Sequence, residues 1–140
     1  MRPQALDALR DCDLIIHAGD VGEPKVLEAL RALAPVHAVR GNVDYGDWAE
    51  QLPMTARVAV GDVAFHVLHD IAQLDSGAPS AGCAVIVYGH SHRPSIETRD
   101  GVLYLNPGSA GPRRFDLPVS LALVRITSRG LSAEIVTLAT

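Results

Sequence analysis

The sequence is poor in positive charge, in aromatic residues and in long apolar runs. Its 12 Lys and Arg residues face 16 Asp and Glu residues, for a formal net charge of −4, and Lys25 is the sole lysine. This balance excludes a basic surface for nucleic acid or anionic lipid, and the Arg113-Arg114 pair is too short to make one. No apolar run approaches the roughly 20 residues that cross a bilayer, and no signal peptide precedes Asp7. We expect a soluble, cytoplasmic protein that binds neither membranes nor nucleic acid.

Cysteine is scarce as well, and its spacing excludes a disulfide framework or a thiolate metal site. Cys12 and Cys83 are too few and too far apart for either, so we expect two buried free thiols in a reducing compartment. Apolar residues, in contrast, make up 48% of the 140 positions. This length and composition predict a single globular domain over residues 1–140 with a core of its own.

The first part of the chain has the pattern of an α/β unit. Apolar residues at helical spacing predict a helix over 3–10 and a second helix between Pro24 and Pro35. Short strands are predicted at 13–18 and 36–39, and the first is apolar on both faces, as a buried parallel strand should be. Strand, helix and strand together predict a βαβ unit with parallel strands.

The remainder of the chain is predicted to be mostly antiparallel β-structure. Turn residues between short strand-like runs predict hairpins, and a segment rich in Gly, Ser and Pro over 71–82 predicts a surface loop. The predicted strands, in order, cover residues 57–60, 63–68, 84–88, 95–98, 102–105, 120–126 and 131–138. The predicted fold class is therefore α/β, with the α/β unit in front and β-structure behind it.

Polar side chains recur where four of the predicted strands end. They are Asp20 after 13–18, Asn42 and Asp44 after 36–39, His69 after 63–68, and His90 and His92 after 84–88. Any one of them alone is more often a helix cap, a turn residue or a packed histidine. Because ligands of parallel α/β sheets bind beyond the carboxyl ends of the strands, their recurrence predicts one site. Carboxylate, amide oxygen and imidazole suit Mn, Fe or Zn better than an all-oxygen calcium site or a thiolate zinc site.

These motifs resemble those of a known family. Gly19-Asp20, Gly41-Asn42, His69 and Gly89-His90-Ser91-His92 are similar to the second to fifth motifs of the calcineurin-like metallophosphoesterase superfamily. Three longer stretches resemble its YfcE-type phosphodiesterases, namely Arg40 to Asp44, His90 to Pro94 and Leu105 to Ser109. The similarity extends over essentially the whole chain, and it implies a two-sheet αββα sandwich.

The resemblance also implies a two-metal site for phosphoester hydrolysis. It assigns Asp20 as the bridging ligand and His92 to the first ion. It assigns Asn42, His69 and His90 to the second ion. The ions would neutralise phosphate oxygens and activate a water for hydrolysis of a phosphodiester. Manganese is the expected metal, with Ni, Fe, Zn and Mg as alternatives, and the expected substrate is a small-molecule phosphoester.

The chain departs from the family pattern at the first motif. Family members begin with a strand ending in Asp-x-His, which completes the ligands of the first ion, whereas this sequence begins where members continue after that motif. We expect a domain that is N-terminally truncated relative to the family, lacks the first strand and therefore has unpaired backbone edges. Either Met1 is assigned too late as the start, or the protein is a short member with a damaged first site.

The sequence also leaves open which residue donates a proton to the leaving group. Many family members have a histidine directly after the Asn, where this chain has Val43, which cannot transfer a proton. Asp44 is then either a catalytic proton donor or a residue that holds a neighbouring histidine in place.

The candidate residues for contact with the substrate phosphate have two interpretations each. Asn106, Gly108 and Ser109 either line the phosphate site with backbone N–H groups or form a rigid turn. Arg93 and Arg113 either contact the phosphate or are solvated surface arginines.

Three functional hypotheses follow from these observations. The first is a divalent-metal-dependent phosphoesterase, with its activity impaired if the first metal site is broken. The alternative is a non-catalytic scaffold or protein-interaction module, because the retromer subunit with the same fold serves protein binding. The third is a one-metal protein that binds a phosphorylated ligand without fast hydrolysis. A homo-oligomer is compatible with each.

Overall fold

The computed structural model describes residues 3–41, 44, 46–73, 82–91, 93–109 and 119–138. Its helices are α1 (Pro3–Ala8), α2 (Pro24–Arg31) and α3 (Asp47–Glu50), with a 3-10 turn η1 at Ile71–Gln73. Its strands are β1 (Ile15–His17), β2 (Val36–Ala38), β3 (Thr55–Val60), β4 (Val63–Leu68), β5 (Val85–Val87), β6 (Ser95–Arg99), β7 (Val102–Asn106), β8 (Ser120–Thr127) and β9 (Gly130–Thr137).

Each helix and strand predicted from the sequence is present, although several ends differ. The helix predicted over 3–10 stops at Ala8, and the strand predicted over 13–18 is confined to Ile15–His17. The helix α3 was not predicted, because its 4 residues are too few to display a helical period. Of the loop predicted over 71–82, residues 74–81 lie outside the described part of the chain.

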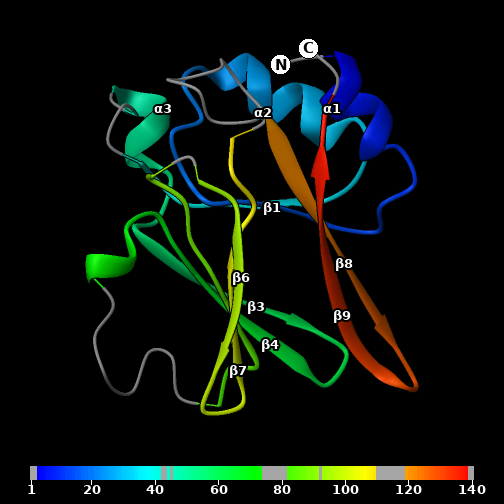
Figure 1. The fold of residues 1–140 in the computed structure, drawn as a ribbon. Helices are drawn as coiled ribbons and strands as arrows, with labels where there is room; N and C mark the ends of the chain where they lie inside the picture. The colour runs from blue at the N-terminus through cyan, green and yellow to red at the C-terminus, as the bar shows by residue number, and fades with distance from the viewer. Residues whose placement is uncertain are drawn as a thin grey trace.

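The strands form one large sheet and two small ones (Figure 1). The five-stranded sheet has the order β3-β4-β5-β7-β6, with parallel pairing of β5 to both neighbours and antiparallel hairpins at the two edges. The predicted βαβ unit is confirmed, because β1 and β2 pair in parallel. The strands β8 and β9 form a separate antiparallel hairpin.

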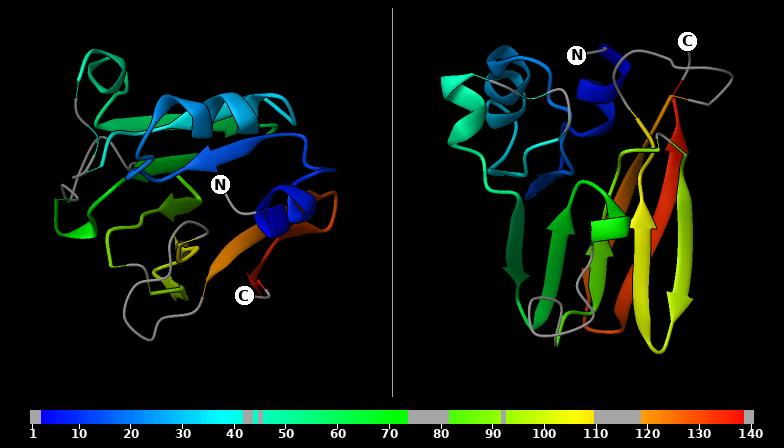
Figure 2. Two further views of the ribbon diagram at one scale, coloured as in Figure 1. Left: turned by 90° about the horizontal axis from the view of Figure 1, so that it is seen from above. Right: turned by 90° about the vertical axis from the view of Figure 1, so that its left-hand side faces the viewer.

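The main core lies between the large sheet and the two small sheets. Its buried members are Val39, Val58, Phe65, Val67, Val85, Val87 and Leu105. Residues of β1 and of β8–β9 pack onto this same cluster from the other side. On the outer faces, α2 packs through Leu27 and Leu30 against the β1–β2 sheet, and α1 packs through Ala5 against β8–β9 (Figure 2). The structure is thus a mixed α/β fold, as predicted.

The two small sheets are not joined into one. Among the residues that the structure describes, no strand lies between β1 and β8, and each small sheet has only two strands. This arrangement leaves one edge of β1 and one edge of β8 without a strand partner within the described ranges.

The two thiols differ in their surroundings. Cys83 is buried and Cys12 is half-buried, and both are free. The prediction that both thiols are buried was therefore wrong for Cys12, which lies in the turn between α1 and β1 next to the exposed Asp11 and Asp13. No helix in the described ranges is long and apolar enough to cross a membrane.

Candidate metal centre

Three of the predicted metal ligands meet beyond the carboxyl ends of β1, β4 and β5. The Nε2 atom of His69 lies 3.2 Å from Oδ2 of Asp20. The same nitrogen lies 3.3 Å from Nδ1 of His90, and the two imidazole rings stand edge to face at 82°. His69 is buried, Asp20 is half-buried and His90 is exposed, so the cluster is open to solvent on the His90 side. The predicted ligands Asn42 and His92 lie outside the described residues.

Backbone conformation at this cluster is unusual. Asp20 and His90 have positive φ angles of 54° and 70°. Non-glycine residues rarely adopt this left-handed region, and such strain tends to occur at functional sites. Both loops therefore direct their side chains toward His69 at some conformational cost.

Two glycines allow the loops to approach each other. A Cβ atom on Gly19 would lie 2.6 Å from Nδ1 of His69, and a Cβ atom on Gly41 would overlap the backbone nitrogen of Asp20. Gly19 also has a φ of +98°. A side chain at either position would push Asp20 or His69 away from the cluster.

The tautomer of His69 follows from its hydrogen bond to the backbone. Its Nδ1 lies 2.7 Å from the carbonyl oxygen of Ala18, and because a carbonyl can only accept, Nδ1 carries the proton. In the neutral ring Nε2 then has a lone pair, which faces the carboxylate of Asp20.

This donor set fits a divalent metal ion. A positive charge, carried either by a proton on Nε2 of His69 or by a metal ion bound to both groups, holds this nitrogen and the carboxylate of Asp20 at 3.2 Å. Imidazole and carboxylate ligands suit Mn, Fe, Ni or Zn, and a backbone bond on the second ring nitrogen is the usual support for a ligating histidine. The described side chains alone do not contain a group of three or more His, Cys, Asp or Glu residues with the geometry of a complete metal site.

Asp44 connects the loops that follow β1 and β2. Its carboxylate accepts backbone N–H groups from Val21 at 3.1 Å, Gly22 at 2.8 Å and Gly41 at 2.9 Å. The residue is 6% exposed. These bonds use both carboxylate oxygens and run to the backbone rather than to a histidine, so the geometry favours a positioning role over proton donation.

Asn106 plays the same part for the loop that carries His90. Its Nδ2 donates to the carbonyl of Gly89 at 3.2 Å and to the hydroxyl of Ser91 at 3.1 Å. Its Oδ1 accepts the N–H of Gly108 at 2.9 Å. The side chain and the Gly108 N–H are therefore used within the protein, which supports the rigid-turn interpretation of this segment.

The remaining phosphate candidates are spread around the cluster. Ser109 lines a cavity beside it and pairs with Val119, and its carbonyl accepts the N–H of Ser120. Arg93 is exposed, and its backbone N–H donates to the Ser91 hydroxyl at 3.3 Å. Arg113 lies outside the described residues.

Sequence reasoning missed two supporting groups of the cluster. Nδ1 of His17 accepts the N–H of Gly19 at 3.3 Å, and desolvation lowers the pKa of His17, which favours the neutral ring that this bond requires. A histidine at the end of a strand, two residues before Gly19, was the available signal. The carbonyl of Ala18 had no signal, because a backbone group leaves no trace in residue type.

Comparison with known proteins agrees with this geometry. Residues 1–129 match the profile of the calcineurin-like phosphoesterase superfamily domain. A relative from Methanothermobacter thermautotrophicus, named a probable metallophosphoesterase, is 34% identical over 142 residues, which cover 96% of this chain and 81% of the relative. The chain therefore belongs to the calcineurin-like phosphoesterase superfamily, a family of hydrolases that generally use divalent metal ions. The family predicted from the motifs is confirmed.

Solved structures share the fold. A predicted phosphoesterase from Streptococcus pneumoniae superposes with a TM-score of 0.71 at 27% identity, over 94% of this chain and 80% of that one. A Vps29 structure from Entamoeba histolytica has a TM-score of 0.74 at 21% identity, over 96% of this chain and 89% of that one. At this identity the second similarity shows the fold alone.

Proposed function

We propose that this protein is a divalent-metal-dependent phosphoesterase that hydrolyses phosphodiesters of small molecules. The observation that carries the proposal is the convergence of three side chains at His69, whose Nδ1 lies 2.7 Å from the carbonyl of Ala18 and whose Nε2 lies 3.2 Å from the carboxylate of Asp20 and 3.3 Å from Nδ1 of His90. The cluster sits on strained, glycine-supported loops at strand ends, and this placement is typical of catalytic sites in α/β proteins.

The residues that would hold the metal are Asp20, His69 and His90, together with Asn42 and His92. A bound divalent ion would neutralise phosphate oxygens and lower the pKa of a water that attacks the phosphorus. Manganese is the proposed metal, because carboxylate, amide and imidazole ligands suit it, with Ni, Fe, Zn and Mg as alternatives. Asp44 and Asn106 hold the ligand-bearing loops in position.

The test is manganese-dependent hydrolysis of bis(p-nitrophenyl) phosphate by the purified chain, with metal content measured on the same sample. We expect His90→Ala to abolish hydrolysis and to lower the bound metal, because it removes one of the three ligands that meet in the cluster. The matched control is His37→Ala, since His37 is an exposed histidine on β2. Unchanged metal stoichiometry in His90→Ala would contradict the ligand assignment.

The same assay separates the proposal from its alternatives. Stoichiometric metal without turnover would favour a protein that binds a phosphorylated ligand. A sample that contains no bound metal and shows no turnover would favour a non-catalytic interaction module on this fold.

A further inference from the structure

The turn that carries His90 has a strained backbone. The N–H of Ser91 bonds to the carbonyl of Gly89, two residues back in the chain, at 2.9 Å, and His90 between them has a φ of 70°. A bond of this span across a residue of positive φ makes a γ-turn of the rare, strained kind. Such a conformation persists only where the surrounding structure holds it in place, so the turn needs support from outside its own three residues.

Asn106, at the end of β7, holds both residues that flank His90. Its Nδ2 donates to the carbonyl of Gly89 at 3.2 Å and to the hydroxyl of Ser91 at 3.1 Å. The side chain of Asn106 is 1% exposed, so these bonds lie away from bulk water, where hydrogen bonds are electrostatically stronger. The turn that they hold directs His90 toward His69, whose Nε2 lies 3.3 Å from Nδ1 of His90. The geometry of the turn and the position of the His90 imidazole are therefore coupled.

The orientation of the Asn106 amide is set on its other side. Its Oδ1 accepts the N–H of Gly108 at 2.9 Å, which leaves Nδ2 as the atom that faces the turn. Gly108 has a φ of +81°, and a Cβ atom there would overlap the hydroxyl of Ser120. The segment that orients Asn106 is thus packed directly against β8.

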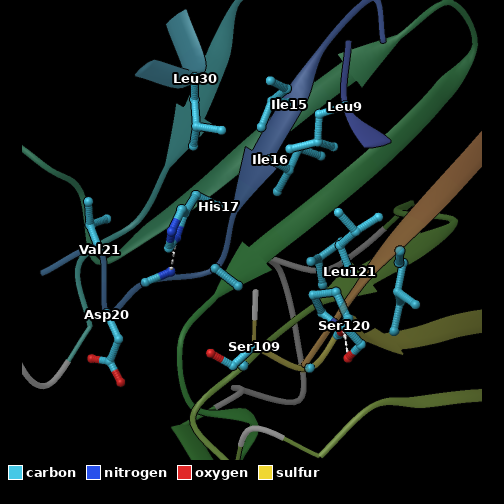
Figure 3. Close-up of a pocket in the computed structure, with 18 of the residues that line it drawn as sticks. Leu9, Ile15, Ile16, His17, Asp20, Val21, Leu30, Ser109, Ser120 and Leu121 are labelled. Atoms are coloured by element: carbon cyan, nitrogen blue, oxygen red, sulfur yellow. Dashed lines mark hydrogen bonds between the residues drawn. The ribbon is translucent and has the colours of Figure 1, made fainter. Parts of the chain in front are cut away.

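Ser120 of β8 holds both residues that flank Gly108. Its hydroxyl donates to the carbonyl of Pro107 at 2.8 Å, and its N–H bonds to the carbonyl of Ser109 at 3.0 Å. Ser120 is buried as well, at 1% exposure. Figure 3 shows Ser109 and Ser120 in the wall of the cavity whose lining also includes Asp20. One buried serine of the β8–β9 hairpin therefore fixes this second turn from both sides.

These bonds form one continuous chain from β8 to the metal cluster. We call it the relay, and it runs from Ser120 to Pro107–Ser109, to Asn106, to Gly89–Ser91 and so to the imidazole of His90. Both Nδ2 bonds of Asn106 leave the 106–109 segment, which a turn that serves only its own rigidity does not require. The relay therefore connects two different sheets, since His90 follows β5 of the large sheet and Ser120 begins β8.

We propose that Ser120 is a positioning residue of the metal centre, and that through the relay it holds the strained turn that directs His90 toward His69. The proposal rests on the proposed function, since it takes His90 as a metal ligand. It goes further by giving a role to a residue of β8, a strand that supplies none of the proposed ligands. Loss of the Ser120 hydroxyl lets the 107–109 turn and the Asn106 amide shift, and His90 then relaxes out of the γ-turn.

The first experiment uses the metal-free chain and follows the imidazole NMR signals of His69 and His90. We expect Ser120→Ala to shift both signals, because the two rings stand edge to face and would move relative to each other. The matched control is Ser132→Ala, since Ser132 is an exposed serine on the same hairpin and its loss should leave both signals in place.

The second experiment measures manganese binding by calorimetry, together with the visible absorption of bound cobalt(II), which reports the geometry of the ligands. We expect Ser120→Ala to weaken manganese binding by roughly three- to tenfold and Asn106→Ala by roughly tenfold or more, as for residues that support metal ligands. The cobalt spectrum should change in both variants and not in Ser132→Ala. A residue that only stabilises the fold would lower the melting temperature of the protein without changing this spectrum.

Ser91 provides a rescue at the exposed end of the relay, which remains informative if a buried variant fails to fold. Ser91→Ala removes the hydroxyl that accepts from Asn106, whereas Ser91→Thr keeps a hydroxyl at this position. We expect Ser91→Ala to bind manganese roughly threefold or more weakly, and Ser91→Thr to bind it as the wild type does.

Two results would overturn the proposal. One is an unchanged NMR signal of His90 in a folded Ser120→Ala. The other is wild-type manganese affinity and an unchanged cobalt spectrum in Ser120→Ala and Ser91→Ala. If the wild-type chain binds manganese but does not hydrolyse bis(p-nitrophenyl) phosphate, the proposed function fails, while the same measurements still support or overturn the role of Ser120. If the wild-type chain binds neither manganese nor cobalt, both proposals are wrong.

Discussion

Substitution of Asp44 distinguishes a positioning carboxylate from a proton donor. Its side chain accepts three backbone N–H groups, from Val21 and Gly41 on Oδ2 and from Gly22 on Oδ1. Asp44→Ala leaves these donors without an acceptor in a buried place, at about 1–3 kcal/mol each. We therefore expect a loss of roughly 3–5 kcal/mol in the free energy of unfolding.

Asp44→Asn should have an intermediate effect. Its amide oxygen can take the place of Oδ2 and keep the bonds from Val21 and Gly41, but its NH₂ group then faces the N–H of Gly22. We expect a loss of about 1–2 kcal/mol. At about 3 °C per kcal/mol for a domain of this size, Asp44→Ala should lower the melting temperature by roughly 10 °C.

The assay is urea unfolding followed by circular dichroism, with Asp62→Ala as the control because Asp62 is exposed in the β3–β4 turn. The control should change the free energy of unfolding by less than about 0.5 kcal/mol. The reasoning is refuted if Asp44→Ala is as stable as the control. Asp44 would be identified as the proton donor if Asp44→Asn is as stable as the wild type but has lost both kcat and the alkaline limb of its pH–rate profile.

Two further predictions concern a glycine and a buried histidine. Gly19→Ala places a Cβ atom 2.6 Å from Nδ1 of His69 and should weaken manganese binding by roughly tenfold or more, whereas Gly22→Ala, also at positive φ but with nothing within 4 Å, should not. Equal manganese affinity in calorimetric titrations of both variants would rule out the clash as the cause. Burial, and secondarily Arg57, lowers the pKa of His66, so the folded state binds its proton less readily than the unfolded state, whose pKa is about 6.5. The contribution of His66 to the free energy of unfolding is present above about pH 6.5 and is lost as the pH falls below that value. We expect His66→Gln to flatten the pH dependence of the free energy of unfolding, measured with urea between about pH 7 and 5. If the variant and the wild type have the same pH dependence, His66 is not its source.

The secondary structure was predictable because its signals are local. The β3–β4 hairpin follows from apolar strands around Gly61-Asp62, and the β6–β7 hairpin from Asp100-Gly101. The exact ends of β1 and the short α3 were not predictable, since they depend on contacts outside each segment.

The candidate site was predictable in part. Asp20, His69 and His90 could be grouped because each follows a strand, and strand ends converge at one edge of a sheet. Two of the three partners of Asp44 lie 22 and 23 residues away in the sequence, and two of the three partners of Asn106 lie 15 and 17 residues away. Which atoms these two side chains bind was not visible in their residue types.

The sequence by itself therefore determined the order of helices and strands, the family, and the positions of the polar residues at the strand ends, because periodicity and motifs act over a few neighbouring residues. Only the tertiary structure decided the cavity lined by residues of β1 and β8 and the tautomer of His69. The carbonyl of Ala18 that sets this tautomer lies 51 residues from His69. A contact over that separation exists only after β1 and β4, which belong to different sheets, have packed onto the same core.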